Sequence, residues 1–348
     1  MKILDFFYEE ELDFKNAIER KQEINSKNLI IKGARHSGKR SLLLSYLKNF
    51  DKKEILFLNF KDLRFKEDSL LFLDDFLKNK IIKIIIFYGV NENFTFNFSN
   101  LIDSYQIIIC TEFASVKIDF FEEIWLDFLD FEEFLSLSKK NPQLGTYFQI
   151  GRCLKNEQNG FLNDYLSNSF SNLELEILKY VALNLGLEFS INELYTRLKK
   201  NMKLSKDGIY KAVSELENRY ILHFVKHSDK ALKKVYFSDF AFKNALCLQK
   251  DFKKLFANAI LCELFKFKEE IFYNKHFDFV LKDKKIAFIA ADFFDVDLLV
   301  LKAKKLVYKA LELGIFHIIF ISLSNETIFY EEGVKVEVLP FENWALSL

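Results

Sequence analysis

Short, nearly continuous apolar runs recur through the first 130 residues of the chain. They occupy residues 28–31, 54–59, 82–88 and 105–110, and stretches with the spacing of amphipathic helices separate them. Strands that are apolar on both faces and alternate with helices are typical of a parallel sheet covered on both sides. The pattern therefore predicts an α/β domain with a parallel sheet over residues 1–130.

The middle of the chain has a different pattern. Residues 131–168 hold three of the ten glycines and predict short helices that form a lid or connector. Residues 169–245 predict three helices and then two strands, at 221–226 and 234–238, with Ser190 and Glu193 spaced as a capping box at a helix start. This order of elements is typical of a winged helix-turn-helix.

The last hundred residues contain both the helical and the strand pattern of apolar positions. A long helix is predicted at 297–313, and apolar runs predict strands at 279–281, 286–290, 315–322 and 334–338. We therefore expect a second α/β domain over residues 250–348.

Composition narrows the possible functions only slightly. The 348 residues include 50 basic and 50 acidic side chains, so global charge gives no argument for a nucleic-acid or membrane partner. A membrane-spanning helix needs about 20 mostly apolar residues, and the apolar runs are shorter. The acidic N-terminus and the scattered cysteines and histidines predict a cytoplasmic protein without a zinc site.

The strongest motif follows the first predicted strand and opens a helix. It reads Gly33-Ala34-Arg35-His36-Ser37-Gly38-Lys39-Arg40-Ser41. In a loop of this spacing the backbone amides turn toward phosphates and the lysine reaches the β and γ groups, while the helix start adds partial positive charge. We expect these nine residues to hold a nucleotide's phosphates, with Ser41 at the α-phosphate.

Two departures from the usual site concern the metal. The residue after the lysine normally bears a hydroxyl that holds Mg²⁺, but here it is Arg40, which has donors only. Acidic residues are expected at the end of another strand, where this chain has Phe87 and Tyr88. The sequence thus identifies no metal ligand and no catalytic residue, and it makes a role for Mg²⁺ doubtful.

The next predicted strand ends in Thr111 and Glu112. Thr111 stands where a side chain could sense a phosphate, although a plain strand end explains it equally well. Glu92 or Glu112 could replace the missing acids, and the protein would then be an active ATPase. Alternatively, the loop is a relic in a DNA- or protein-binding module without catalysis.

With these motifs in this order, the chain resembles a family of AAA-type P-loop ATPases with a C-terminal winged helix and a restriction-endonuclease-like domain of unknown function. The resemblance covers nearly the whole chain at low identity and rests on the order of segments GARHSGKRSLL, LFLNFKDLRF, IIICTEFAS, LDFLDFEEFLSL, NRYILHFV, KKVYFSDFAFKNAL, HFDFVLKDKKIAFIAA and VEVLPFENWAL. It implies ATP or ADP as the cofactor and marks this chain as a degenerate member.

The nuclease-like segment also departs from that family. Glu263 and Asp278 match expected carboxylates, but the following Glu-x-Lys falls on Ile289-Ala-Ala291. A nuclease of this type needs several oxygen ligands for Mg²⁺ and a lysine that polarises the attack. We therefore expect no nuclease activity, and we place Glu263 on a solvated helix and Asp278 in a turn.

A basic segment lies within the predicted winged helix. Residues 197–234 contain 11 Lys or Arg against 4 Asp or Glu. Such a segment could bind DNA phosphates or a protein partner, or it could be a solvated face. The sequence as a whole predicts a nucleotide-binding protein with weak or no hydrolysis that acts as a nucleotide-responsive scaffold.

Overall fold

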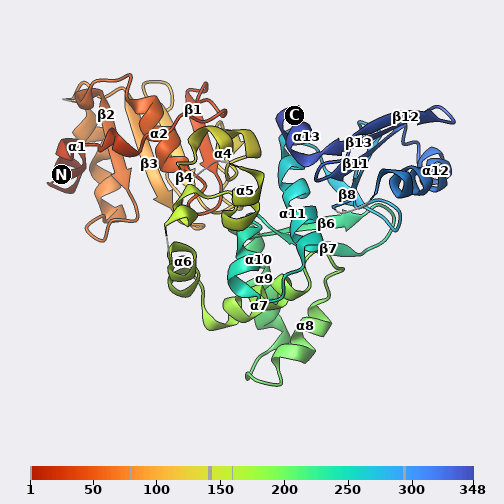
Figure 1. Ribbon diagram of the computed structural model, residues 1–348. Coiled ribbons are helices and arrows are strands. Elements are labelled where there is room, and N and C mark those ends of the chain that lie inside the picture. Colours follow the sequence, from red (N-terminus) through yellow and green to blue (C-terminus); the bar gives the residue numbers. More distant parts are fainter. Residues whose placement is uncertain (1, 79, 140–142, 159, 293–294) are drawn as a thin grey trace. The chain divides into compact units, whose positions relative to one another are not determined.

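A computed structural model describes residues 2–78, 80–139, 143–158, 160–292 and 295–348 (Figure 1). The chain divides into two compact units: residues 1–128 with 218–220, and residues 129–217 with 221–348. Within the described residues, no helix combines the length and the apolar character that crossing a membrane requires.

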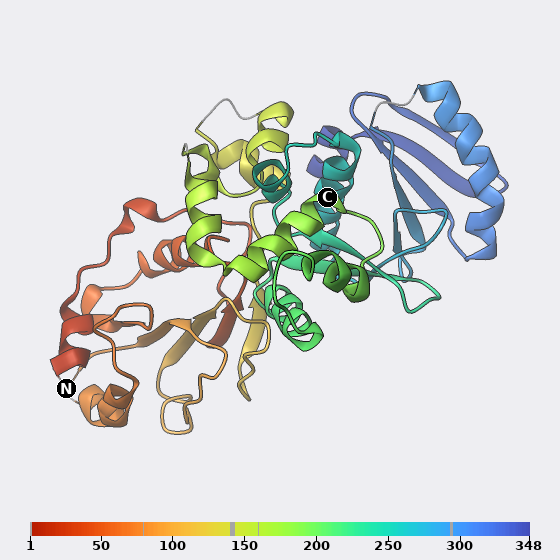
Figure 2. The same cartoon turned by 90° about the horizontal axis from the view of Figure 1, so that it is seen from below.

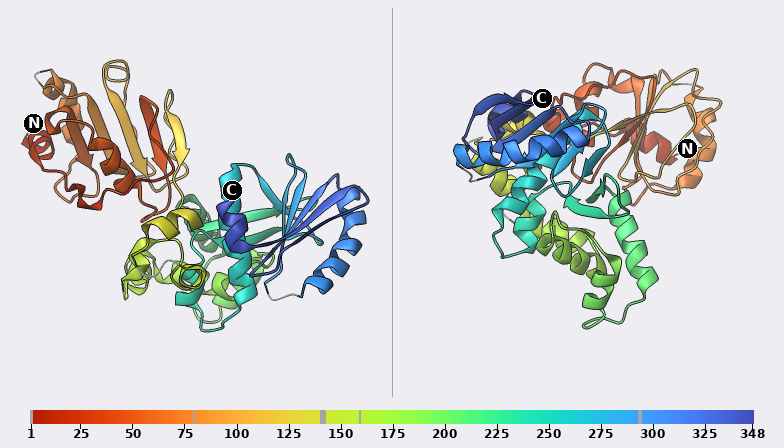
Figure 3. Two further views of the ribbon diagram at one scale, coloured as in Figure 1. Left: turned by 45° about the horizontal axis from the view of Figure 1, so that its top comes forward. Right: turned by 90° about the vertical axis from the view of Figure 1, so that its right-hand side faces the viewer.

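The first unit is built on a parallel sheet with the strand order β2-β3-β4-β1-β5 (Figures 1 and 3). Its strands are β1 (Asn28–Lys32), β2 (Ile55–Asn59), β3 (Ile84–Val90), β4 (Gln106–Thr111) and β5 (Glu122–Trp125). All four neighbouring pairs are parallel, which confirms the predicted sheet. This mixed α/β arrangement is consistent with a P-loop NTPase-like domain.

Helices cover both faces of this sheet. The helices are α1 (Lys2–Glu9), α2 (Lys39–Leu47) and α3 (Leu73–Leu77). Leu42, Leu43 and Leu47 of α2 pack on one face, against Ile86 and Ile108. On the other face, α1 and α3 share a core with alternate strand residues. Both faces are therefore buried, which explains the continuous apolar strands.

The second unit begins with helices, which are α4 (Phe131–Leu137), α5 (Leu144–Ile150), α6 (Phe161–Ser169), α7 (Asn172–Leu183), α8 (Ile191–Leu198) and α9 (Lys206–Asn218). Helix α10 (Ala241–Leu246) follows after two strands. The segment predicted as a lid or connector does form short helices. Phe131, Phe134 and Tyr147 from this segment join Phe256 and Phe341 in one buried cluster. The segment thus contributes to the core of the second unit.

A second sheet, with the strand order β12-β13-β11-β10-β9-β8-β6-β7, completes this unit. Its strands are β6 (Leu222–His227), β7 (Lys233–Phe237), β8 (Ile271–Tyr273), β9 (Phe279–Leu281), β10 (Ile286–Ala290), β11 (His317–Ser322), β12 (Thr327–Glu331) and β13 (Val334–Pro340). Helix α12 (Val296–Glu312) packs on one face of the sheet, as Figure 2 shows, and α11 (Phe252–Leu264) and α13 (Phe341–Leu346) pack on the other.

The elements expected for a winged helix occur in the expected order. Helices α7, α8 and α9 precede the antiparallel hairpin of β6 and β7. Strand β6 also pairs with β8, through Lys226 and Phe272, so the hairpin is part of a larger sheet. The Ser190 side chain accepts a hydrogen bond from the Glu193 amide at the start of α8. The assignment as a winged helix stays a prediction.

The two tryptophans of the chain lie in different units. Trp125 is the last residue of β5 and has 36% of its surface exposed. Trp344, on α13, is 2% exposed and packs against Phe288 and Phe341.

Candidate nucleotide site

The glycine-containing loop joins the end of β1 to the start of α2. Gly38 is the residue before α2, and its φ of 99° is a left-handed value that favours glycine. Gly33 sits against the chain after β5, since a Cβ there would lie 2.2 Å from the Leu126 carbonyl oxygen. The predicted strand, loop and helix are therefore all present, and the loop lies at the carboxyl end of a central parallel strand, where α/β sheets bind ligands.

An arginine outside the motif supports the loop from the side. Arg20 donates one hydrogen bond to the Ser37 carbonyl oxygen (2.7 Å) and another to the Asp127 carbonyl oxygen (3.1 Å). The guanidinium thereby ties the loop to the segment after β5. Sequence reasoning missed Arg20, because no spacing rule relates it to a loop that starts 13 residues later.

Lys39 is buried and turned into its own loop. Its ammonium group donates to the carbonyl oxygens of Gly33 (2.5 Å) and Ala34 (2.7 Å). Burial lowers the pKa of Lys39 to about 8, although the nearby Glu112 carboxylate acts in the opposite direction. Among the described residues, the hydrogen-bond partners of this buried charged group are two backbone oxygens. An anion that replaces them would stabilise it.

Ser37 adds a second polar group inside the loop. Its residue is 3% exposed, and its hydroxyl oxygen has no hydrogen-bond partner among the described residues. A Cβ built on Gly33 would lie 2.9 Å from this oxygen, so the hydroxyl faces the loop interior. A buried hydroxyl without a partner is unfavourable, and a ligand oxygen would satisfy it.

The other loop residues have distinct surroundings. Ala34 is buried, His36 adopts a left-handed φ of 68°, and Ser41 lies partly buried in the first turn of α2. Arg35 and Arg40 are exposed. The structure thus keeps all nine predicted residues on one loop and helix start, and their contact with phosphate stays a prediction.

The two aromatic residues at the end of β3 face opposite sides of the sheet. Phe87 is fully buried in the core shared with α1 and α3. Tyr88 packs on the face that carries α2, against Phe57 at 5.6 Å between ring centroids. Burial raises the pKa of Tyr88 to about 12, so its phenol stays protonated at neutral pH. The side of β3 that faces the loop therefore carries a neutral ring.

Arg40 extends over these rings. Its guanidinium carbon lies 5.7 Å from the Phe57 ring centroid and 6.0 Å from that of Tyr88, distances at which cation–π attraction operates. A residue of α2 thus reaches the middle of β2 and the later part of β3 on the α2 side of the sheet.

Thr111 and Glu112 at the end of β4 already have protein partners. The buried Thr111 hydroxyl donates to the Val90 carbonyl oxygen (3.0 Å) and accepts from the Phe113 amide (3.1 Å). Glu112 pairs with Lys61 at 3.2 Å. Burial acts to raise the pKa of Glu112, but Lys61 and Lys39 outweigh it, and the pKa is lowered. Glu112 is therefore an ionised carboxylate close to the loop, and phosphate sensing by Thr111 stays untested.

The residues around the loop do not fit Mg²⁺. This cation prefers oxygen ligands, in particular carboxylates. Position 40 offers a guanidinium, and β3 offers two aromatic rings in place of acids. In the described parts of the chain, no group of three or more His, Cys, Asp or Glu is placed to hold a metal ion.

In the second unit, the carboxylates expected of a nuclease-like site have structural partners. Glu263 is completely buried, so its assignment to a solvated helix was wrong. It accepts hydrogen bonds from the Phe131 amide (3.0 Å) and the Tyr147 hydroxyl (2.8 Å) and pairs with Lys266 (2.9 Å). Asp278 accepts from the Ala290 amide (2.9 Å). The apolar run Ile286–Ala290 that the sequence predicted as a strand is β10, which leaves no catalytic cluster there among the described residues.

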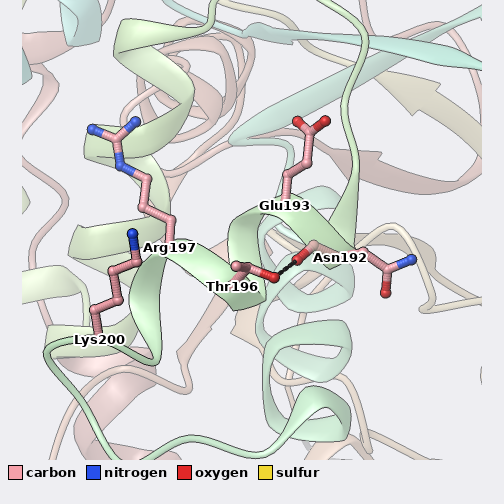
Figure 4. A pocket seen from close by; sticks show the side chains of 5 residues that line it. All are labelled: Asn192, Glu193, Thr196, Arg197 and Lys200. Carbon is pink, nitrogen blue, oxygen red and sulfur yellow. Dashed lines mark hydrogen bonds between the residues drawn. The ribbon is translucent and has the colours of Figure 1, made fainter.

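The basic segment at 197–234 has internal partners for part of its charge. Lys211 pairs with Glu215 (3.8 Å) and Lys226 with Glu270 (2.7 Å), while Lys233 lies over the Phe224 ring. Figure 4 shows an open pocket at α8, lined by Asn192, Glu193, Thr196, Arg197 and Lys200. Arg197 and Lys200 lie on one side of it and Asn192 on the other.

Comparisons with known proteins give limited similarity. No protein-family model and no curated protein matches the sequence. Among solved structures, a Walker-type ATPase of Pyrococcus abyssi is similar with a TM-score of 0.42 and 12% identity, over 64% of this chain and 91% of that chain. A structure of Drosophila ORC bound to AT-rich DNA and Cdc6 is similar with a TM-score of 0.21 and 16% identity, over 63% of this chain and 84% of that chain. Scores at this level do not establish function, so the case for a nucleotide site rests on the loop itself.

Proposed function

We propose that the first unit binds an adenine nucleotide through the loop at residues 33–41. The observation that carries this proposal is the buried ammonium of Lys39, held by two carbonyl oxygens of its own loop. When phosphate arrives, Lys39 exchanges those carbonyls for phosphate oxygens, and the Ser37 hydroxyl gains a partner. The start of α2 adds its partial positive charge. The adenine base is inferred from the family resemblance of the sequence.

Hydrolysis is expected to be slow or absent. The α2-facing position at the end of β3 is Tyr88, whose raised pKa keeps the phenol protonated. A protonated phenol neither holds Mg²⁺ nor removes a proton from an attacking water. Bound nucleotide would then act as a regulatory ligand of a scaffold, in line with the degenerate motifs.

One observation favours an ATPase as the second candidate. Glu112 is ionised and its charge acts on Lys39, so it stands near the phosphates that the loop would hold. Its ion pair with Lys61 has to open before it can act as a base. The other acid considered, Glu92, is exposed.

The remaining parts of the proposal concern the second unit. Residues 169–245 would serve as a winged helix, and the segment 197–234 would contact DNA or a protein partner. Residues 250–348 would be a degenerate restriction-endonuclease-like domain. The burial of Glu263 among structural partners supports the absence of nuclease activity.

Nucleotide binding is tested by replacing Lys39 with alanine. We expect Lys39→Ala to weaken ATP binding by about 2 kcal/mol, or about thirtyfold in Kd, because charge-assisted hydrogen bonds to phosphate are lost. Titration calorimetry or a fluorescent ATP analogue measures the change. Lys48→Ala, an exposed lysine that follows α2, is the matched control and should bind as the wild type does.

Equal affinity of the wild type and Lys39→Ala would contradict nucleotide binding at this loop. The same samples report on turnover. A steady ATPase rate of about 1 s⁻¹ or faster, which is in the ordinary enzyme range, would favour the second candidate, and loss of that rate in Glu112→Gln would assign the base.

A further inference from the structure

The charge on a bound nucleotide has to be neutralised, and the structure shows which groups are available for this. In P-loop proteins, Mg²⁺ bridges the β- and γ-phosphate oxygens and is held by the hydroxyl after the lysine and an acid on a neighbouring strand. Arg40 and Tyr88 stand at those two positions in this chain. Neither side chain is a ligand for a hard divalent cation at neutral pH.

The position of Arg40 is defined by the two rings beneath it. Phe57 on β2 and Tyr88 on β3 pack against each other, and the guanidinium lies about equally far from both. Arg40 is exposed, and cation–π attraction occupies none of its N–H groups, so the guanidinium stays able to donate paired hydrogen bonds to phosphate oxygens. The guanidinium thus lies near Tyr88, the position at which a P-loop protein would carry an acid for the metal.

The surrounding charges agree with this arrangement. Tyr88 is a neutral phenol and Phe57 is apolar, so neither competes with a phosphate for the guanidinium. The carboxylate of Glu112 pairs with Lys61, at an Nζ–Oε2 distance of 3.2 Å. Lys39 and Arg40 are adjacent in sequence, which places two positive charges at the start of α2 at neutral pH.

We propose that Lys39 and Arg40 together neutralise the nucleotide's phosphates, so that the protein binds metal-free ATP or ADP without a divalent cation. This inference rests on the proposed nucleotide binding and specifies the ionic form of the ligand. Free ATP carries more negative charge than its Mg²⁺ complex. A site with two cations, whose nearby carboxylate Glu112 is already paired with Lys61, favours the free form.

The test measures the affinity of the full chain for ATP with excess Mg²⁺ and again with EDTA. We expect the two affinities to agree within about threefold, or binding in EDTA to be tighter, because no protein ligand holds the metal. A drop of tenfold or more on chelation, about 1.4 kcal/mol, would overturn the inference while leaving nucleotide binding in place. No binding in either condition would overturn both the inference and the proposed function.

Variants at position 40 separate the contribution of the Arg40 guanidinium to affinity from that of the rest of the loop. Arg40→Ser restores the usual hydroxyl, and we expect it to weaken binding in EDTA about tenfold or more, since bonds to a charged group are lost. Arg40→Ser combined with Tyr88→Asp should make binding depend on Mg²⁺. Lys48→Ser removes a cation at the far end of α2 and should change neither affinity.

Arg40 is exposed, so Arg40→Ser is expected to fold, whereas the double variant also changes the packed Tyr88. Thermal unfolding curves check both variants. Unchanged affinity of folded Arg40→Ser in EDTA would show that the guanidinium does not contact phosphate, and the inference would fail.

Discussion

The two units bury charged side chains in opposite ways. In the first unit, the Lys39 ammonium has two backbone carbonyl oxygens as partners, and the Ser37 hydroxyl beside it has none among the described residues. In the second unit, the buried carboxylates of Asp239 and Glu263 each accept several hydrogen bonds. An incoming anion would give Lys39 and Ser37 new partners, whereas Asp239 and Glu263 are already bound by several groups of the protein.

Asp239 illustrates the second case. Its carboxylate accepts from the amides of Arg152 (3.1 Å) and Ala241 (3.0 Å) and from the Asn156 side chain (3.2 Å). Burial raises its pKa to about 6 in spite of these donors. A Cβ at Gly151 would lie 2.1 Å from one of its oxygens, so the backbone approaches this carboxylate closely. Such a carboxylate joins the chain segments around it and thus has a structural role.

The difference shows how to separate a ligand site from a structural network. Strong burial of a charge is common to both units, and a shifted pKa accompanies both. The distinguishing feature is the set of partners, because a charge bound by several protein donors indicates a structural role, and one held only by loop carbonyl oxygens indicates a ligand site.

The largest expected effect follows from removing one member of the buried network. Glu263→Ala leaves the Phe131 amide, the Tyr147 hydroxyl and the Lys266 ammonium without their acceptor, and we expect a loss of about 3 kcal/mol or more in the free energy of unfolding. Urea unfolding measures it. Glu270→Ala removes an exposed partner of Lys226 and should have no measurable effect. Similar stability of the two variants would break the comparison, since Glu263 would then not be a structural charge.

A smaller effect is expected from pH, and it concerns Lys39. Burial lowers its pKa to about 8, so the free site loses its charge as the pH rises through that value. Phosphate favours the charged form, and affinity for ATP should therefore fall above pH 8, by at most about tenfold per pH unit. Titrations from pH 7 to about 9.5 test this. Lys39→Arg keeps its charge throughout, and its affinity should stay level over the range. A level profile in the wild type would show that Lys39 does not titrate at the site.

The smallest effect concerns the surface of the second unit. If residues 197–234 bind DNA, affinity should fall steeply as the salt concentration rises from about 50 to 200 mM. Replacing the exposed Lys200 and Lys203 by glutamine should lower the slope of log binding constant against log salt concentration by about 2. Electrophoretic mobility shifts with duplex DNA measure both. Lys304→Gln with Lys305→Gln, on α12, is the matched control. Absence of binding at low salt would leave the basic segment as solvated surface.

Hydrophobic periodicity was a good guide to the fold where burial is continuous. The strands predicted at 279–281 and 286–290 are observed as β9 and β10 with the same bounds, and the expected helix at 297–313 is α12 to within one residue at each end. Strands β5, β8 and β12 were missed. Strands β5 and β12 lie at sheet edges and bury little, so their sequences lack the apolar run that marks a central strand. Strand β8 lies inside the sheet, but it has three residues, too few for a recognisable run.

The site was predictable only where its residues are local in sequence. The loop at 33–41 has a defined spacing, and the structure places it as expected between β1 and α2. Arg20 and Glu263 contact segments that are distant in sequence, so no local sequence pattern predicts these contacts. For Glu263 a signal was present, because it follows the apolar run Ala259–Cys262 within α11, which is typical of a helix buried on all sides.

The placement of the two tryptophans gives each unit its own optical reporter. Trp125 precedes Leu126, whose carbonyl oxygen closely approaches Gly33, and Trp344 is enclosed by rings in the interior of the second unit. Indole emission depends on the polarity around the ring, so a Trp344→Phe chain reports on the neighbourhood of the loop and a Trp125→Phe chain on the packing around α13. Intrinsic fluorescence can therefore follow ligand binding in one unit and melting of the other without an added label.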